Sequence, residues 1–534
     1  MMSRDSARGS SHLPAGTRSL APGDFSFAGF GELRRDELRK IAKLSIRTDP
    51  PAVSVVENAI FVPGSGESLS RKTKLIGGIV KPDGQPIETA QLHRKGGKHF
   101  GGLTEAVSVA VERELDEDVV YLGPLFPHYG RVLLESLARV WYLSEVDPSV
   151  KVIFNHTTTS RDAKMVQADY PPWVFKLLSI FGIPMDRILA LESQTRLRRA
   201  ILPEPLFEQL SSAHVDMVRP FREVAARVAG DVSMSGQPLY LSRRRLTSRE
   251  RPVVGESALE DLLRENGFAI AYPETMTFED QIRLINGHED IFSSVGSAAH
   301  TILFALNKPR LHLLTHRESI SGNFFLCSAI ADVPTTFVDC LGSGGRASPK
   351  AERRNREAES AEIPPDNQAV DTVVGPQSVP QLLEWDRVVS YLDQTGFLAS
   401  KSPAAMPDLD ALANLKRRYD EAWFYTRLRL TSKRQGSLSA DLEREALDFA
   451  SESWPISFVL AVYYAGAGDR VRADMLANQF ASLLDQEFDV DRLAYYRGDF
   501  HELTGQLAPA CEPVTANRLA SLLVERFPPQ SLDE

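Results

Sequence analysis

Cysteine is scarce in this chain of 534 residues, which contains only Cys327, Cys340 and Cys511. So few thiols at such wide spacing exclude a disulfide framework and a Cys-x-x-Cys zinc pair, and they suit a reducing compartment. Basic charge is also not in excess, because the formal net charge is −10. Since a general nucleic-acid-binding protein is normally basic over at least one domain, we expect no nucleic-acid partner.

Long apolar runs are missing as well. Residues Met1 to Pro22 lack the apolar core of a secretory signal. The most apolar later stretch, Ile456 to Ala465, is shorter than the roughly 20 residues that span a bilayer. We therefore expect a cytoplasmic protein whose contact with a membrane would be at most peripheral.

Shifts in composition divide the chain into segments. Polar, Gly- and Pro-rich stretches predict a tail and a linker. The last segment has a helical pattern with a helical hairpin over residues 456–485. The hairpin is similar to one tetratricopeptide-type repeat, but the segment shows no regular period. The expected segments are a flexible N-terminal tail over 1–48, an α/β lobe over 49–235, a second lobe over 236–345, a linker over 346–377 and a helical region over 378–534.

Apolar strands and amphipathic helices alternate from Val119 to Thr315. This alternation predicts an α/β fold with parallel sheets covered on both faces. A Ser257–Glu260 capping box is expected to open one helix, and Thr277 the next. The main predicted elements are strands at 151–155, 187–191, 199–204, 238–243, 268–272, 291–295 and 310–314, and helices at 129–144, 171–182 and 298–306.

Three features place polar groups where these strands end, the edge that faces ligands in open α/β sheets. Arg243 can hold phosphate through two bonds of its guanidinium. Gly296 and Ser297 come at the start of a predicted helix, whose free backbone N–H groups can form an anion site. The Glu274 carboxylate can accept a hydrogen bond from a ribose hydroxyl. Taken singly, these features also fit a solvated basic loop, an ordinary tight turn and a simple helix entry.

A fourth feature lies earlier in the chain. His128 precedes the predicted helix over 129–144, in which Arg131, Glu135 and Arg139 share one face at four-residue spacing. The pattern fits a solvated stripe of weak Arg–Glu pairs. It also fits an acid–base group in which His128 or Glu135 accepts the proton of an attacking hydroxyl.

Together, the blocks HYGRVLLESLARVW, YLSRRRLTSRERPVVGESALEDLLRENGFAIAYPETMTFEDQIRLI and SSVGSAAHTILFA resemble glycosyltransferase family 61, which includes many bacterial polysaccharide-biosynthesis enzymes. The resemblance extends from about Ala52 to Cys340. It implies a GT-B architecture of two Rossmann-like lobes. It also implies inverting transfer from a nucleotide sugar, typically UDP-linked, to a glycan or other hydroxyl acceptor, without a metal or other cofactor.

The resemblance also implies roles for individual residues. His128 and Glu135 match the catalytic block of the first lobe, while Arg131 and His300 are further candidates at positions where this chain departs from the usual family residues. Val295 is a third departure, because many relatives carry His there. The implied donor-binding residues are Arg243, Glu256, Glu274, Gln281, Gly296 and Ser297.

The expected reaction is a single in-line displacement, with Arg243 and the Gly296–Ser297 turn stabilising the leaving diphosphate. Two alternatives stay open. The departures leave room for a catalytically altered member that binds a sugar nucleotide or a glycan. The helical region 378–534 leaves room for a scaffold that recruits a protein partner.

Overall fold

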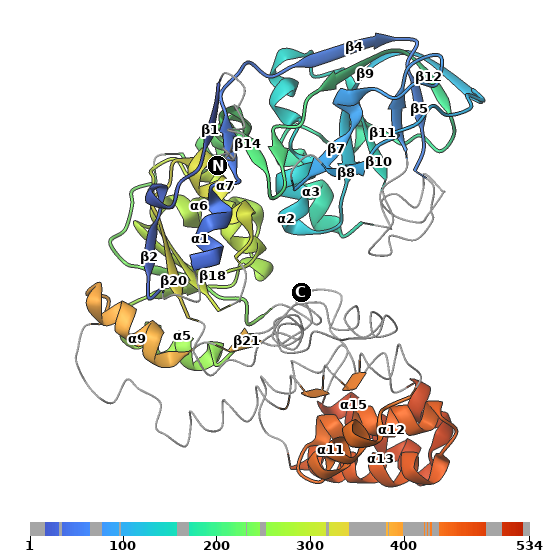
Figure 1. The fold of residues 1–534 in the computed structure, drawn as a ribbon, viewed down its shortest axis with the longest axis vertical. Helices are drawn as coiled ribbons and strands as arrows, with labels where there is room; N and C mark the ends of the chain where they lie inside the picture. The colour runs from blue at the N-terminus through green and yellow to red at the C-terminus, as the bar shows by residue number, and fades with distance from the viewer. Residues whose placement is uncertain are drawn as a thin grey trace, which may run out of the picture. The chain divides into compact units, whose positions relative to one another are not determined.

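The structure, a computed structural model, shows a mixed α/β protein with parallel sheets and a helical C-terminal region (Figure 1), which confirms the predicted α/β class. Two compact units divide the chain: Met1–Leu241, Met276–Thr315 and Ser319–Asp339 form unit 1, and Ser242–Thr275, His316–Glu318 and Cys340–Glu534 form unit 2. The residues described are 16–30, 35–64, 77–95, 98–156, 170–230, 232–245, 253–316, 320–340, 381–382, 384–398, 421, 424–425, 428–429, 437–486 and 505–526.

The first sheet of unit 1 is mixed and seven-stranded, in the order β11-β10-β9-β12-β5-β6, with β4 also paired to β12. The strands β9 to β12 are parallel, and the earlier strands pair antiparallel. The buried faces of these strands form one apolar core. The strands are β4 (Val53–Glu57), β5 (Ile60–Val62), β6 (Gly78–Val80), β9 (Arg113–Leu125), β10 (Lys151–His156), β11 (Ile188–Leu189) and β12 (Thr195–Pro203).

The second sheet of unit 1 contains the parallel path β15-β18-β19-β20-β2. Its central strands are buried along almost their whole length, as expected for a parallel sheet covered on both faces. Near the start of β18, the Asp290 carboxylate accepts two hydrogen bonds from Arg310 and one from His312. The strands are β2 (Ser26–Ala28), β15 (Leu239–Leu241), β18 (Asp290–Ser294), β19 (Arg310–Thr315) and β20 (Thr335–Asp339).

Several helices of unit 1 are positioned around these sheets. The helices α4, α6 and α7 all contact the 3-10 helix η10. The helices are α1 (Arg35–Ile41), α2 (Tyr129–Arg131), α3 (Pro172–Ile180), α4 (Arg219–Ala229), α6 (Phe278–Asn286), η10 (Ser297–Phe304) and α7 (Gly322–Ala331).

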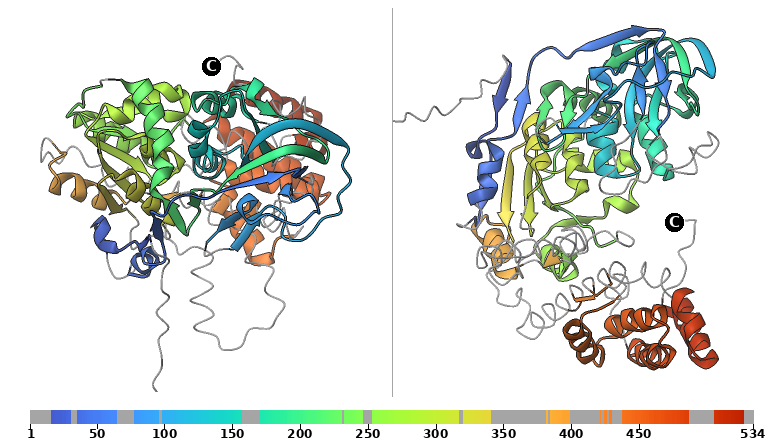
Figure 2. Two further views of the ribbon diagram at one scale, coloured as in Figure 1. Left: turned by 90° about the horizontal axis from the view of Figure 1, so that it is seen from above. Right: turned by 45° about the vertical axis from the view of Figure 1, so that its right-hand side comes forward.

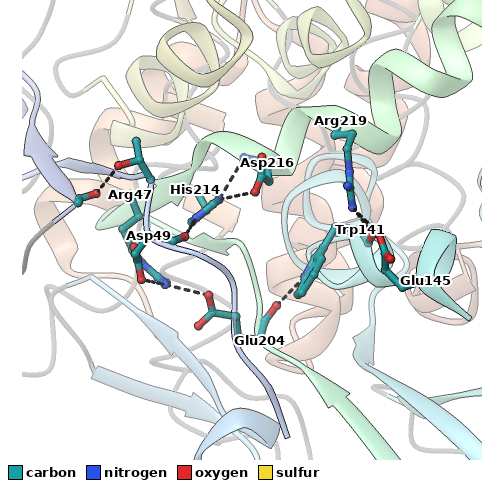
Figure 3. Close-up of polar contacts among 10 residues, drawn as sticks. Arg47, Asp49, Trp141, Glu145, Glu204, His214, Asp216 and Arg219 are labelled. Carbon is teal, nitrogen blue, oxygen red and sulfur yellow. Dashed lines mark hydrogen bonds and ion pairs between the residues drawn. The ribbon is translucent and has the colours of Figure 1, made fainter.

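A small third sheet, β1-β3-β14-β13, lies where the chain passes between the larger sheets. Arg47 pairs with Asp49 at 3.0 Å and with Glu204 at 2.8 Å (Figure 3). One guanidinium thus links the segment after β3 to the segment after β12. His214 accepts from the Asp216 N–H through Nδ1, and therefore donates from Nε2 to the Asp49 carbonyl. The strands are β1 (Thr17–Ser19), β3 (Ser45–Arg47), β13 (Phe207–Glu208) and β14 (Ser212–His214).

The expected flexible tail over residues 1–48 is wrong for its described part. The strand β1 pairs with β3, and β2 pairs with β20. Phe27 stacks on Phe337 with ring centroids 5.7 Å apart, and Leu20 is 1% exposed. The Ser-, Gly- and Pro-rich composition concealed these strands because their partners lie far away in the sequence.

Three predicted helix features also differ from the structure. The expected helix over 129–144 is divided into α2, the π-helix η4 (Val132–Ser136) and the 3-10 helix η5 (Val140–Glu145), because the Leu137 N–H bonds the Val132 carbonyl in a widened turn. The expected helix over 298–306 is the 3-10 helix η10. The predicted Ser257–Glu260 capping box is wrong, since α5 (Glu256–Glu265) begins after Gly255.

Unit 2 contains α5, β17 (Ala269–Ala271) and a C-terminal helical group. The predicted hairpin over 456–485 is confirmed as α12 and α13, which lie among the red and orange C-terminal helices (Figure 2). These helices share one buried core with their neighbours. No helix among the described residues is long and apolar enough to cross a membrane. The predicted linker over 346–377 lies outside the described residues. The C-terminal helices are α9 (Trp385–Gln394), α11 (Ala440–Ala450), α12 (Trp454–Gly466), α13 (Arg470–Asp485) and α15 (Pro513–Arg526).

Candidate active site

His128 stands where the chain leaves the first sheet. The strand β9 ends at Leu125, and His128 is the exposed N-cap residue of α2. Its backbone carbonyl accepts from the N–H groups of Arg131 and Val132, at 2.9 Å each. The imidazole thus projects from a rigid helix entry at the carboxyl edge of a parallel sheet, where ligands bind in open α/β folds.

Glu135, the other predicted catalytic residue, is buried inside an ion-pair group. Its side chain is 0% exposed. Arg94 donates to both carboxylate oxygens at 2.6 Å, and Arg131 Nε donates to Oε2 at 2.9 Å. The Arg131 guanidinium also lies 3.5 Å from the centroid of the Phe126 ring. Burial lowers the pKa of Arg131 even though Glu135 opposes the change.

The predicted solvated stripe over Arg131, Glu135 and Arg139 is therefore wrong. Arg139 is 1% exposed, and its guanidinium donates to the carbonyls of Thr89, Gln91 and Pro203. Every residue from Val132 to Val140 is buried, so this stretch has no solvent face. The charged residues instead fix the segment that begins at His128.

Gly130 is the point at which His128 meets the turn that follows β18. A Cβ atom at Gly130 would lie 3.1 Å from Ser297 Cβ, 3.4 Å from His300 Cδ2 and 3.6 Å from His128 Cε1. A side chain at this position would force these neighbours to move by a few tenths of an ångström. The structure thus brings together His128, Ser297 and His300, which are up to 172 residues apart in the sequence and were predicted separately. Gly296, in extended backbone, caps η10 and precedes Ser297.

The His300 ring is held in an apolar position beside this point. The side chain is 7% exposed and stacks on Phe324, with ring centroids 4.9 Å apart. Within the described part of the chain, its Nδ1 atom has no hydrogen-bond partner. Burial, with a smaller effect of His128, lowers the pKa of His300 to about 4. His300 is therefore neutral at pH 7, as an imidazole deprived of water should be.

Aromatic side chains fix the helix entry on its other side. Tyr129 stacks on Phe278 of α6 at 6.0 Å between ring centroids, and Trp173 of α3 contacts both rings edge-on. The Tyr129 hydroxyl and the Thr301 hydroxyl are hydrogen-bonded at 2.9 Å. Gln281, a predicted donor-binding residue, lies on α6 and is 7% exposed.

The remaining predicted donor-binding residues belong to unit 2. Glu256, at the start of α5, is 4% exposed and accepts from the Arg243 backbone N–H at 2.9 Å. Glu274 is exposed. Desolvation by the surrounding protein raises the pKa of Glu274, against the opposing charges of Arg243 and Arg245. The Glu256 carboxylate therefore holds the loop that carries Arg243.

Glu260 is a buried residue of this loop region that the sequence interpretation missed. Its side chain is 0% exposed and accepts from the Ser242 hydroxyl at 2.6 Å and the Tyr272 hydroxyl at 2.7 Å. Arg264 donates to it at 2.7 Å. Burial alone would raise the pKa of Glu260, but these hydrogen bonds lower it. Its position inside a predicted capping box gave no signal of this role.

Metal-binding geometry is not found among the described residues, which contain no group of three or more His, Cys, Asp and Glu side chains that could hold an ion. Unit 1 offers the start of η10 beside His128, and unit 2 separately offers Arg243. Groups of this kind suit an anionic ligand.

Parallel sheets with polar groups at their carboxyl edges are typical of α/β enzymes that bind ligands at that edge. Residues 129–311 match the model of the family Glycosyltransferase 61. The match confirms the resemblance found from the sequence and identifies this segment, about a third of the chain, as a glycosyltransferase 61 region. It contains every candidate site residue except His128, which precedes it by one position. No curated protein matches the chain.

Proposed function

We propose that this protein is an inverting, metal-independent glycosyltransferase that moves a sugar from a nucleotide sugar, most simply a UDP-sugar, to a hydroxyl acceptor. The family match implies glycosyl transfer. The finer proposal adds that the two parallel-sheet regions correspond to the lobes of a GT-B enzyme and that the acceptor is a growing polysaccharide in the cytoplasm. These additions rest on the resemblance described above.

The observation that carries the proposal is the meeting of His128 with Ser297 and His300 around Gly130. An inverting transfer needs a base and an anion-stabilising group on opposite sides of one sugar carbon. His128 is an exposed imidazole at the end of one parallel sheet, and Ser297 begins a helix at the end of another. The segments that carry His128 and Ser297, which the proposed mechanism places on the same sugar, both lie beside Gly130.

We assign the role of base to His128 rather than Glu135. The oxygens of Glu135 are engaged by three N–H groups of two arginines. A proton on this carboxylate would break buried ion pairs, which is costly. His128 accepts the proton of the acceptor hydroxyl while the hydroxyl oxygen forms a bond to the anomeric carbon. The bond from that carbon to the diphosphate breaks, and the bonding electrons leave with the diphosphate.

The charge that develops on the leaving group needs fixed positive partners. At the start of η10, the N–H groups of Ser297 and Ala298 precede the first helical hydrogen bond, which the Ala299 N–H donates to the Gly296 carbonyl. A preorganised donor of this type typically lowers a barrier by about 3 kcal/mol. In unit 2, Arg243 is the proposed ligand for the nucleotide diphosphate, since its guanidinium can bind two phosphate oxygens.

The first experiment is a thermal-shift screen of the purified chain against UDP, GDP and CMP. A shift with UDP alone supports the proposal, and the absence of a shift with every nucleotide contradicts it. Transfer or donor hydrolysis is then measured with UDP-sugars for the wild type, His128→Ala and Glu135→Gln. We expect His128→Ala to lower kcat at least a hundredfold with unchanged melting temperature, because general-base catalysis typically contributes about 10² to 10⁴.

The matched variant separates the two candidate bases. Glu135→Gln removes the buried charge and leaves Arg94 and Arg131 facing each other, so we expect a loss of stability of about 3 kcal/mol. Undiminished turnover in His128→Ala would show that the base is another group. Nucleotide binding without any transfer would instead favour the catalytically altered, sugar-nucleotide-binding member of the fold. That alternative is motivated by the departures at Arg131, Val295 and His300, and the engagement of Glu135 in ion pairs adds to it.

A further inference from the structure

Two consecutive backbone amides of unit 2 are bound by side chains. The Arg243 N–H donates to Glu256 at 2.9 Å, and the Arg244 N–H donates to the Ser242 hydroxyl at 3.1 Å. We call Ser242–Arg245 the arginine loop. These two amides are already engaged, and the Arg244 guanidinium pairs with Glu260 at 3.4 Å. The loop would therefore bind a ligand through the guanidinium of Arg243 rather than through these amides.

Glu260 fixes the hydrogen bond between the Arg244 N–H and the Ser242 hydroxyl. The Ser242 hydroxyl has a single proton, which it donates to the buried Glu260 carboxylate at 2.6 Å. Its lone pairs are thereby turned toward the Arg244 N–H, which donates to it. The negative charge of Glu260 thus decides the direction of the Ser242 hydroxyl. A charged acceptor also makes this bond stronger than a bond between neutral groups.

Glu260 also fixes the far end of the arginine loop. The Tyr272 hydroxyl donates to Glu260 at 2.7 Å, and the Arg245 guanidinium lies 4.1 Å from the centroid of the Tyr272 ring. A planar guanidinium over a tyrosine face is attracted by the ring electrons. One buried carboxylate therefore holds the loop through Ser242 at its start and through Tyr272 at its end.

We propose that Glu260 is a positioning residue that keeps the arginine loop in the shape that binds the donor diphosphate through Arg243. The inference rests on the proposed function, because it presumes that Arg243 is a donor ligand. It assigns Glu256 to the same task, as an acceptor for the Arg243 amide rather than a direct ligand of the donor. Glu260 touches no substrate and acts only through the loop.

The test is the affinity of the full chain for UDP, measured by isothermal titration beside the melting temperature. Ser242→Ala removes the link between Glu260 and the Arg244 amide, and Glu260→Gln removes the charge but keeps an oxygen acceptor. We expect both variants to bind UDP about tenfold more weakly, since a lost hydrogen bond to a preorganised group is worth about one power of ten. We expect Arg243→Ala to weaken binding at least as much.

Arg264→Ala is the matched control. Arg264 donates to the same Glu260 carboxylate at 2.7 Å and to the Tyr272 hydroxyl at 2.9 Å. Because a guanidinium only donates, it cannot bond the loop amides. This variant should melt at a lower temperature and bind UDP within twofold of the wild type. Equal losses of affinity in Ser242→Ala and Arg264→Ala would mean a purely structural role and would overturn the inference.

The outcomes also distinguish the inference from the proposed function. If Arg243→Ala weakens UDP binding while Ser242→Ala and Glu260→Gln do not, the positioning role is wrong and donor binding by Arg243 stands. If Arg243→Ala binds UDP as tightly as the wild type, the proposed donor residue itself is wrong. If the wild-type protein binds none of UDP, GDP and CMP, both the proposed function and the positioning role of Glu260 are wrong.

Discussion

Gly130→Ala tests the junction on which the proposed active site depends. The added methyl group would lie 3.1 Å from Ser297 Cβ and 3.4 Å from His300 Cδ2, so these neighbours must move by a few tenths of an ångström. Overpacking of this kind costs about 1–3 kcal/mol, while alanine gains about 1 kcal/mol over glycine in helix propensity. The free energy of unfolding should therefore fall by roughly 0–2 kcal/mol.

The effect on turnover should be larger than the effect on stability. A misplacement of 1 Å can cost about a hundredfold in rate, so a shift of half that size is expected to lower kcat about tenfold. Transfer from the donor and urea unfolding would be measured on the same preparations. Gly236→Ala is the control, because a Cβ there meets nothing within 4 Å. Wild-type kcat in a folded Gly130→Ala protein would refute the idea that His128 and Ser297 act together.

The other predictions concern stability and domain organisation. Burial would raise the pKa of Asp290, but His312 and Arg310 hold it at about 2. Asp290→Asn should therefore lower the free energy of unfolding by about 2 kcal/mol at pH 7, and the difference should shrink as the pH falls from 4 to 2; a gap constant with pH would contradict this. Arg139→Met should cost about 3 kcal/mol in urea unfolding, because three buried carbonyls lose their donor. Deleting residues 399–534 removes the whole C-terminal core, which includes Phe424, Tyr425 and Leu428, and should leave transfer measurable; loss of transfer by a folded truncated protein would show that catalysis needs this region.

The sequence predicted elements best where a single period dominated. The strands near 151, 291 and 310 and the Thr277 cap are present as expected, because buried parallel strands and capped helices leave local signatures. The segment after Tyr129 was predicted poorly. There the burial of Arg139 and Glu135 replaced the amphipathic pattern that a solvent-facing helix requires, and charged residues were taken for an exposed face.

The candidate site was predicted residue by residue but not as an arrangement. Polar residues at strand ends pointed to His128 and Ser297, and only the structure reveals that Gly130 brings them together. Glu256 was expected to touch a ligand, and its carboxylate accepts the Arg243 backbone N–H of the arginine loop. Glu260 could not be found from sequence, because a glutamate inside an amphipathic helix is usually exposed.

The pairing of β2 with β20 has a consequence for synthesis. The ribosome makes residues 26–28 first and their neighbours, residues 335–339, more than three hundred residues later. At roughly 5–20 residues per second, the early strand waits about 15 to 60 s for its partner. During that interval Phe25 lacks its partner Phe325 and Phe27 lacks its partner Phe337, so nascent chains that stall before residue 335 should be recognised by chaperones that bind exposed aromatic segments.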